Sequence, residues 1–229
     1  MRIVTALFPE AKPIIEKYDL TPMGGDLMFP IYQKNGYFLV VSGIGKINSA
    51  IATTYLHLKS GESRNQPFLN IGIAGHHRPI KGMSIVANKI TEKISGDTKY
   101  PPQIIFEPNH RSHLISVEEL ENNYEIDAAY DMEGYGFYVS ALRSTTAELT
   151  QSLKIISDHP TSPANNLDAN KIENLIRSVG GHTRLCEVGL DGDADIEMLI
   201  ERVNTQRLSN NPRHIVPETL RQLLYSIRH

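Results

Sequence analysis

The alternation of short apolar runs with helical patterns over roughly residues 1–160 constrains the fold most. Apolar runs of this length, separated by helical segments, predict an α/β fold with a largely parallel or mixed sheet. The runs lack polar alternation, so both faces of the sheet should be covered. The predicted strands are Ile3–Phe8, Tyr37–Val41, Phe68–Ile73, Ser84–Ile90, Ile104–Phe106 and Lys154–Ser157.

Helical patterns lie between these strands and continue after them. Ser116 stands three residues before Glu119, which is the capping-box spacing and predicts a helix start over Ser116–Glu121. The other predicted helices are Pro9–Tyr18, Ile47–Leu58, Tyr130–Leu142, Asp168–Val179, Asp195–Val203 and Pro217–Ile227. Only helices are predicted beyond about residue 162. We therefore expect an α/β domain over residues 1–180 and a helical C-terminal extension over residues 181–229, packed on the domain.

Charge and composition exclude several classes of protein. The net charge is −3, from 23 basic and 26 acidic residues, which argues against a nucleic-acid-binding or membrane-surface protein. One cysteine, Cys186, excludes an intrachain disulfide, and no secretory signal or apolar run of about 20 residues is visible. These features predict a cytoplasmic protein. The nine histidines show no metal-ligand spacing, so we expect neither a metal nor a cofactor.

Unusual residues follow four of the predicted strands. In an open α/β sheet, ligands bind beyond the carboxyl ends of the strands. The four segments are Phe8-Pro9-Glu10, Ser42-Gly43-Ile44-Gly45, Gly72-Ile73-Ala74-Gly75 and Ser157-Asp158. The glycine pair at positions 43 and 45 either brings backbone N–H groups to a phosphate or sugar or makes a tight turn. It is no dinucleotide fingerprint, because Asn48 stands at the third glycine position.

Three carboxylates near these segments have two interpretations each. Asp158 is either a helix cap or a functional group at the sheet edge. Glu133 and Glu10 are either functional groups or helix-start carboxylates that the helix dipole stabilises. The residues alone leave these alternatives open.

Five segments in this order resemble the nucleoside phosphorylase/nucleosidase superfamily, and among its branches the methylthioadenosine/S-adenosylhomocysteine nucleosidases. The matching segments are Ile3–Glu10, Ser42–Ala50, Asn70–Gly75, Asp131–Gly134 and Ile155–Asp158. The resemblance implies a three-layer α/β/α sandwich around a twisted mixed sheet, assembled as a homodimer. It also implies cleavage of the N-glycosidic bond between a purine and a ribose.

The resemblance implies roles for individual residues. Asp158 resembles the general acid that protonates the purine at N7, and Glu10 resembles the carboxylate that positions and deprotonates the attacking water. Glu133 and Met132 resemble the ribose contacts. These types suit the reaction, because a carboxylate stabilises the positive charge that develops on the ribose and an acid neutralises the departing base.

The remaining substrate-binding residues implied by the resemblance are Ser42, Gly43, Gly75, Ser157 and Lys154. Lys154 departs from the pattern, since the nucleosidases usually carry an arginine there. A second departure is the bulky run His76-His77-Arg78 after Gly75. No matching motif supplies a base pocket, for which Phe106 and Tyr130 are candidate stacking groups.

Three functions follow as hypotheses, of which hydrolysis is preferred. A phosphorylase uses phosphate instead of water and needs several cationic donors, whereas the run around Gly43-Ile44-Gly45 contains only Lys46, and Arg2 precedes the first strand. Arg78 is the residue that would reverse this preference. The third hypothesis is a catalytically silent nucleoside-binding module that keeps the fold.

Overall fold

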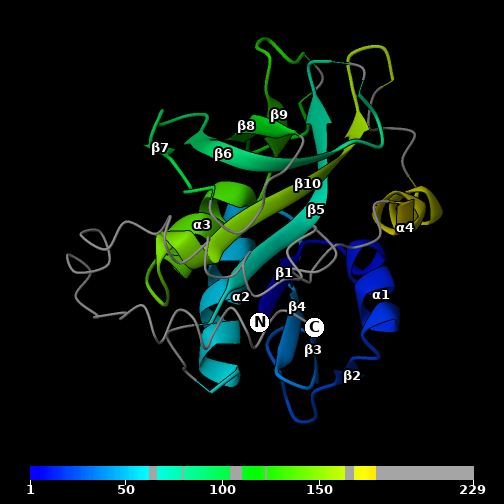
Figure 1. Cartoon of the computed structure of the whole chain (residues 1–229), viewed down its shortest axis with the longest axis vertical. Helices are drawn as coiled ribbons and strands as arrows, with labels where there is room; N and C mark the ends of the chain where they lie inside the picture. Colours follow the sequence, from blue (N-terminus) through cyan, green and yellow to red (C-terminus); the bar gives the residue numbers. More distant parts are fainter. Residues whose placement is uncertain (62–65, 79, 104–109, 122, 163–167, 179–229) are drawn as a thin grey trace, which may run out of the picture.

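A mixed sheet of ten strands lies at the centre of the part of the chain that the computed structural model describes, residues 1–61, 66–78, 80–103, 110–121, 123–162 and 168–178 (Figure 1). The strands are β1 (Arg2–Thr5), β2 (Thr21–Pro22), β3 (Ile31–Lys34), β4 (Tyr37–Val41), β5 (Phe68–His76), β6 (Ser84–Glu92), β7 (Thr98–Lys99), β8 (Arg111–Ser116), β9 (Ala129–Asp131) and β10 (Thr150–Asp158). The helices are α1 (Phe8–Lys17), α2 (Lys46–Lys59), α3 (Gly134–Ala141) and α4 (Ala169–Ser178), with a 3₁₀ turn at Ala147–Leu149.

The strand pairing has an open part and a closed part. β1 pairs in parallel with β4 and β5, and β5 pairs in parallel with β10. From β10 the pairing continues through β6, β8 and β9 and returns to β5, so these five strands form a closed ring. On the open side, β3 and β2 add antiparallel strands beside β4. The predicted mixed sheet is confirmed, and the closed ring is a feature that the sequence did not predict.

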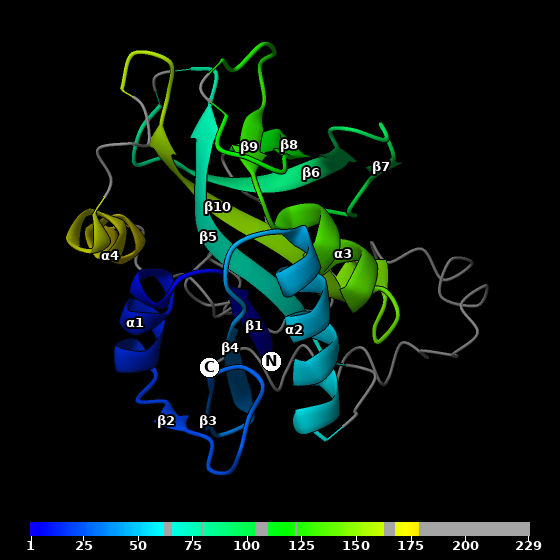
Figure 2. The same cartoon turned by 180° about the vertical axis from the view of Figure 1, so that it is seen from behind.

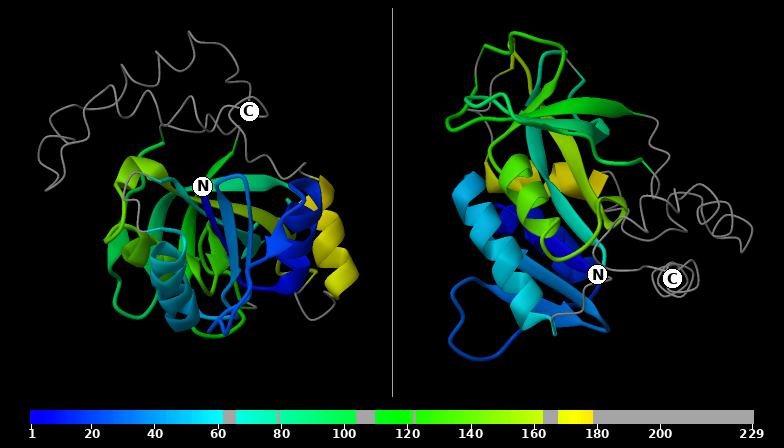
Figure 3. Two further views of the ribbon diagram at one scale, coloured as in Figure 1. Left: turned by 90° about the horizontal axis from the view of Figure 1, so that it is seen from below. Right: turned by 90° about the vertical axis from the view of Figure 1, so that its left-hand side faces the viewer.

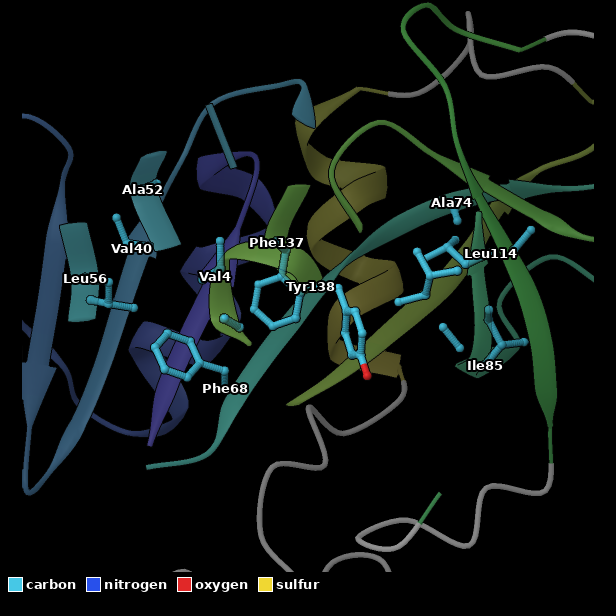
Figure 4. Packing of buried hydrophobic residues seen from close by; sticks show 14 of the residues in the cluster. Val4, Val40, Ala52, Leu56, Phe68, Ala74, Ile85, Leu114, Phe137 and Tyr138 are labelled. Carbon is cyan, nitrogen blue, oxygen red and sulfur yellow. The ribbon is translucent and has the colours of Figure 1, made fainter. Parts of the chain in front are cut away.

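Helices cover both faces of the sheet, as the unbroken apolar strands predicted. α1 and α4 lie side by side on one face, and α2 and α3 lie on the other (Figures 2 and 3). On β1, Val4 packs in the cluster that contains Phe137 of α3, whereas its neighbour Ile3 packs with Ile14 of α1 and Ile176 of α4. Figure 4 shows Val4 and Phe68 of the sheet together with Leu56 of α2 and Phe137 of α3. Successive strand side chains therefore enter opposite layers, as the pleat requires.

Most predicted elements are present, with two corrections. Ser116 does not start a helix but ends β8, where its hydroxyl donates a hydrogen bond to Asp131 Oδ1 (2.7 Å). The predicted helix Tyr130–Leu142 begins as strand β9, and α3 starts only at Gly134. Asp131 Oδ2 accepts the Gly134 N–H (2.8 Å), which fixes this later start.

Some predicted elements lie outside the described residues, and some observed strands were not predicted. The strand Ile104–Phe106, the helices Asp195–Val203 and Pro217–Ile227, and the extension over residues 181–229 fall on residues that the structure does not describe. The strands β2, β3, β7, β8 and the strand character of β9 were missed. No helix in the described part of the chain is both long and apolar enough to cross a membrane.

Candidate functional site

A cavity of about 120 Å³ opens where β1, β5 and β10 end. The sequence predicted a site at these carboxyl ends of the strands. Six of the predicted site residues line it: Glu10, Gly75, Met132, Glu133, Ser157 and Asp158. The other three, Ser42, Gly43 and Lys154, do not line it. Ile44, Leu120, Glu121, Tyr124, Tyr130 and Asp131 are further residues of the wall.

Glu10 is held in place by the start of α1. Leu7 caps this helix, and the Glu10 carboxylate folds back to accept the N–H groups of Ala6 and Leu7 at 2.8 Å each. Its other oxygen accepts the N–H of Ile73 on β5 (2.9 Å). Burial raises the pKa of Glu10, whereas Lys154 and these three N–H groups oppose the increase. The carboxylate is thus fixed at the cavity by the turn between β1 and α1 and by one N–H group of β5.

Glu133 connects the glycine turn after β4 to the cavity. Its Oε1 accepts the N–H of Gly45 (2.8 Å), a residue with φ +101° that favours glycine. The turn therefore presents one backbone N–H to a carboxylate of the same chain. Ser42 is buried below the turn, where its hydroxyl donates to the carbonyl oxygens of Thr5 (3.1 Å) and Gly43 (2.8 Å).

Lys154 lies beneath the cavity as a buried counterion. Its ammonium pairs with Asp131 Oδ2 at 2.9 Å, and both side chains are at most 2% exposed. Burial disfavours the charge of Lys154, but Asp131, Glu133 and Glu10 together outweigh this effect and raise its pKa. A Cβ at position 72 would lie 2.8 Å from Glu10 Oε1 and 3.4 Å from Lys154 Nζ, so Gly72 leaves the space that brings these two groups close.

The buried cluster holds fewer positive than negative charges. One ammonium faces three carboxyl groups, those of Asp131, Glu133 and Glu10. Burial and the charge of Asp131 raise the pKa of Glu133 to about 7, although Lys154 and the Gly45 N–H oppose the change. Glu133 is therefore a proton-exchanging group near neutral pH, at the wall of the cavity.

Asp158 ends β10 and is 4% exposed. It accepts hydrogen bonds from the hydroxyl of Ser157 (2.5 Å) and from the hydroxyl of Tyr124. Gly75 allows this approach, since a Cβ there would lie 2.6 Å from Tyr124 Cζ and 2.7 Å from Asp158 Oδ2. Tyr124 thus occupies the space beside the predicted general acid.

The run His76-His77-Arg78 holds the segment that carries Tyr124. His77 Nδ1 lies 2.6 Å from the Tyr124 carbonyl oxygen, and the His77 N–H donates to the carbonyl of Ala128 (3.2 Å). Arg78 pairs with Asp127. The run therefore anchors the segment from Tyr124 to Ala128 beside Asp158, and His77 and Arg78 do not line the cavity.

Within the described residues, no lysine, arginine or histidine lines the cavity. Lys46 pairs instead with Glu92 (2.6 Å) and with Glu118. Arg2 lies at the start of β1, where its Nε donates to Ser60 Oγ (2.5 Å). In the same part of the chain, no group of three His, Cys, Asp or Glu side chains could hold a metal ion.

Two residues of this site, Asp131 and Tyr124, were not predicted from the sequence. Asp131 stands directly before Met132 and Glu133, and this position is the signal that could have identified it. Tyr124 had no signal, because the described residues around it, 117–121 and 123–128, form no helix or strand and therefore show no periodicity. Tyr130, one of the two candidate stacking residues, lines the cavity, whereas Phe106 lies outside the described residues.

Comparison with solved structures shows what this arrangement is similar to. A 5'-methylthioadenosine/S-adenosylhomocysteine nucleosidase from Colwellia psychrerythraea 34H, in complex with adenine, matches with a TM-score of 0.62 and 18% identity, over 82% of this chain and 94% of that one. The corresponding enzyme from S. pneumoniae, with a transition-state inhibitor, matches with a TM-score of 0.63 and 17% identity, over 82% and 96%. Futalosine hydrolase from Helicobacter pylori strain 26695 matches with a TM-score of 0.57 and 16% identity, over 77% and 96%.

The sequence itself finds no such match. No protein-family model and no curated protein matches it significantly. At 16–18% identity, the agreement with these solved structures concerns the fold. The described part of the chain has the nucleoside phosphorylase/nucleosidase fold, the one found in nucleoside-cleaving enzymes.

Proposed function

We propose that the protein hydrolyses the N-glycosidic bond of a purine nucleoside of the adenosine type and releases the free base and the sugar. One observation carries the proposal: Glu10, Glu133 and Asp158, from distant parts of the chain, line one cavity, and no described cation lines it. A cavity of this charge favours a substrate whose transition state is positive on the sugar. It disfavours an anionic nucleophile such as phosphate.

The proposed steps follow the positions of these groups. The water oxygen attacks C1′ of the ribose and gives a proton to Glu10 Oε1, which accepts one backbone N–H and retains a lone pair, whereas Oε2 accepts two N–H groups. The C1′–N9 bond breaks, and Asp158 protonates the purine at N7. Glu133 and Met132 contact the ribose hydroxyls. Lys154 is a positioning residue that acts through Glu10, Asp131 and Glu133.

Tyr124 must move for a nucleoside to bind. The cavity of about 120 Å³ is smaller than the roughly 300–1,000 Å³ of ordinary small-molecule sites, and the Tyr124 hydroxyl bonds to the oxygen of Asp158 that would face the base. The same contact favours the second candidate, a silent nucleoside-binding module. A binder needs no acid free to donate, whereas an enzyme must release Asp158 from Tyr124.

The test is release of free base from a nucleoside panel, followed by chromatography with and without phosphate. The panel contains methylthioadenosine, S-adenosylhomocysteine, adenosine, deoxyadenosine, inosine and a futalosine-type compound. Hydrolysis predicts release without phosphate, and Asp158→Asn should lower the rate by about 10²–10⁴-fold, the usual contribution of a general acid. Glu119→Gln, on an exposed residue outside the cavity, is the matched control.

Each contrary result selects another function. Release that depends strictly on phosphate would show a phosphorylase. Saturable binding of a nucleoside without any release would show the silent module. An unchanged rate in Asp158→Asn would remove Asp158 from the mechanism.

We also propose that the protein assembles as a homodimer through α2. Ile47, Ile51 and Leu58 on this helix are 70%, 45% and 54% exposed, and Ile44 beside them is 52% exposed. Apolar side chains gathered on one helix mark an association surface more often than scattered ones do. Light scattering after size exclusion should give twice the mass of one chain, and Ile47→Glu should give a monomer. A monomeric wild-type protein would refute the assembly.

A further inference from the structure

A second cavity, of about 740 Å³, begins one residue beyond the candidate site on β5, at His76. Residues of β5, β6 and β8 line it, and these strands lie in the upper part of Figure 1. Among the residues that the structure describes, its wall shares none with the candidate site. Its volume is within the range of about 300–1,000 Å³ that is usual for small-molecule sites.

The wall of this cavity is rich in basic side chains. Six of its residues are cationic or carry imidazole groups: His76, Arg78, Lys89, His110, Arg111 and His113. Three of them, Arg78, Lys89 and Arg111, are cations, and among the described residues of the wall one carboxylate, Asp127, pairs with Arg78. The whole chain has a net charge of −3, so composition does not explain this excess of cations over carboxylates.

Two of the cations are available to a ligand. Among the described residues, neither Lys89 nor Arg111 forms an ion pair with a carboxylate, in contrast to Arg78. Lys89 is half-buried and Arg111 is exposed at the start of β8. An arginine fork and a lysine ammonium together are well suited to a phosphate-type oxyanion.

A β-bulge in β6 turns a side chain toward this cavity. Ala87 pairs with Ser112 and Lys89 pairs with His113, so Asn88 is the extra residue. Neighbouring side chains of a regular strand point to opposite faces, yet Asn88 and Lys89 both line the cavity. Bulges of this kind re-aim side chains beside binding sites.

The same wall has an apolar part. Ile80, Met83, Ile85 and Tyr100 line the cavity beside the basic residues. Ile85 is 1% exposed and belongs to the main hydrophobic core, so this part of the wall is fixed by the fold. A ligand that uses both parts has an apolar or aromatic body and a terminal oxyanion.

We propose that this cavity binds a small organic anion in which a phosphate-type oxyanion is attached to an apolar body. Arg111 and Lys89 bind the oxyanion, and Ile80, Met83 and Tyr100 contact the body. The proposal does not rest on the proposed nucleosidase activity, because the two cavities have no described residue in common.

Phenylphosphonate is the probe, and titration calorimetry on the full chain is the measurement. We expect saturable binding of one molecule per chain. Arg111→Gln and Lys89→Gln should each weaken it about tenfold or more, since each removes a charged hydrogen-bond donor. Arg143→Gln, on an exposed arginine outside the cavity, should leave it unchanged. Arg111→Lys should bind more tightly than Arg111→Gln.

Other ligands test the oxyanion contacts and the apolar contacts separately, and they distinguish this cavity from the candidate site. Inorganic phosphate should bind more weakly than phenylphosphonate, and benzyl alcohol should not bind. Adenine should not displace phenylphosphonate. The proposal is wrong if phenylphosphonate shows no saturable binding, or if the glutamine variants bind it as tightly as wild type does. It is also wrong if phosphate or benzyl alcohol binds as tightly as phenylphosphonate, or if adenine displaces phenylphosphonate. Base release in the panel assay is independent of all these outcomes.

Discussion

Replacement of Glu133 by glutamine tests the charge balance of the buried cluster. The folded protein raises the pKa of Glu133 from 4.5 to about 7, first through burial and then through the charge of Asp131. One pKa unit corresponds to 1.36 kcal/mol, so an ionised Glu133 costs the folded state about 3 kcal/mol relative to the unfolded chain. Glutamine stays neutral at every pH and retains an oxygen that can accept the Gly45 N–H.

The sign of the effect follows from proton binding. Because the pKa of Glu133 is higher in the folded protein, the folded state binds more protons than the unfolded chain between pH 4.5 and about pH 7. The contribution of Glu133 to the free energy of unfolding is therefore most favourable below pH 4.5 and falls as the pH rises through 7. Glu133→Gln should gain stability relative to wild type over this interval, by about 2.5 kcal/mol between pH 5 and pH 8.

Urea denaturation at a series of pH values measures this difference. Circular dichroism gives the free energy of unfolding of wild type, Glu133→Gln and the control Glu119→Gln in one buffer system. The control, on an exposed residue, should follow wild type at every pH. A difference between Glu133→Gln and wild type that stays constant or falls from pH 5 to pH 8 would refute the proposed charge balance.

Three further substitutions test the neighbouring contacts. Lys154→Met removes the buried cation beside Asp131 and should lower the free energy of unfolding by about 3–5 kcal/mol in urea denaturation; a loss below about 1 kcal/mol would contradict its counterion role. Gly75→Ala places a Cβ 2.6 Å from Tyr124 Cζ and 2.7 Å from Asp158 Oδ2 and should lower the free energy of unfolding by about 1–3 kcal/mol; a melting temperature equal to wild type would show that these close approaches are unimportant. Tyr124→Ala alone should enlarge the cavity and raise the affinity for adenine in calorimetry, and a lower affinity would mean that Tyr124 supports the base instead of excluding it.

The place of the site was predictable because it depends on local patterns and one topological rule. β1, β5 and β10 are apolar runs that the sequence marks clearly, and parallel strands end at a common edge. Glu10 and Asp158 directly follow or end such runs, so their convergence followed from chain order. Glu133 follows a strand that was predicted as helix, and its place came from the resemblance.

The rest depends on contacts that are distant in sequence. The ring from β5 through β10, β6, β8 and β9 closes by pairings between separate segments, and no local pattern encodes them. Ser116 has the spacing of a capping box, but its hydroxyl bonds to Asp131 instead, so tertiary contact overrides the local signal. Tyr124 reaches Asp158 only because His77 and Arg78 hold the segment around it.

The basic run after Gly75 contributes to a different cavity from the one that holds the proposed catalytic carboxyl groups. Ala74 and Gly75 of β5 line the candidate site, whose described wall contains five carboxyl side chains. The next residue, His76, lines the second cavity, whose described wall contains six basic or imidazole side chains. Arg78, the residue that would have favoured phosphate as nucleophile, lies in the second wall and pairs with Asp127. A phosphate ion near the candidate site would meet the carboxyl groups of Glu10 and Glu133 without a described cation on that wall to offset them. Because like charges in a poorly solvated cavity repel strongly, this arrangement supports the proposal that water, and not phosphate, is the nucleophile.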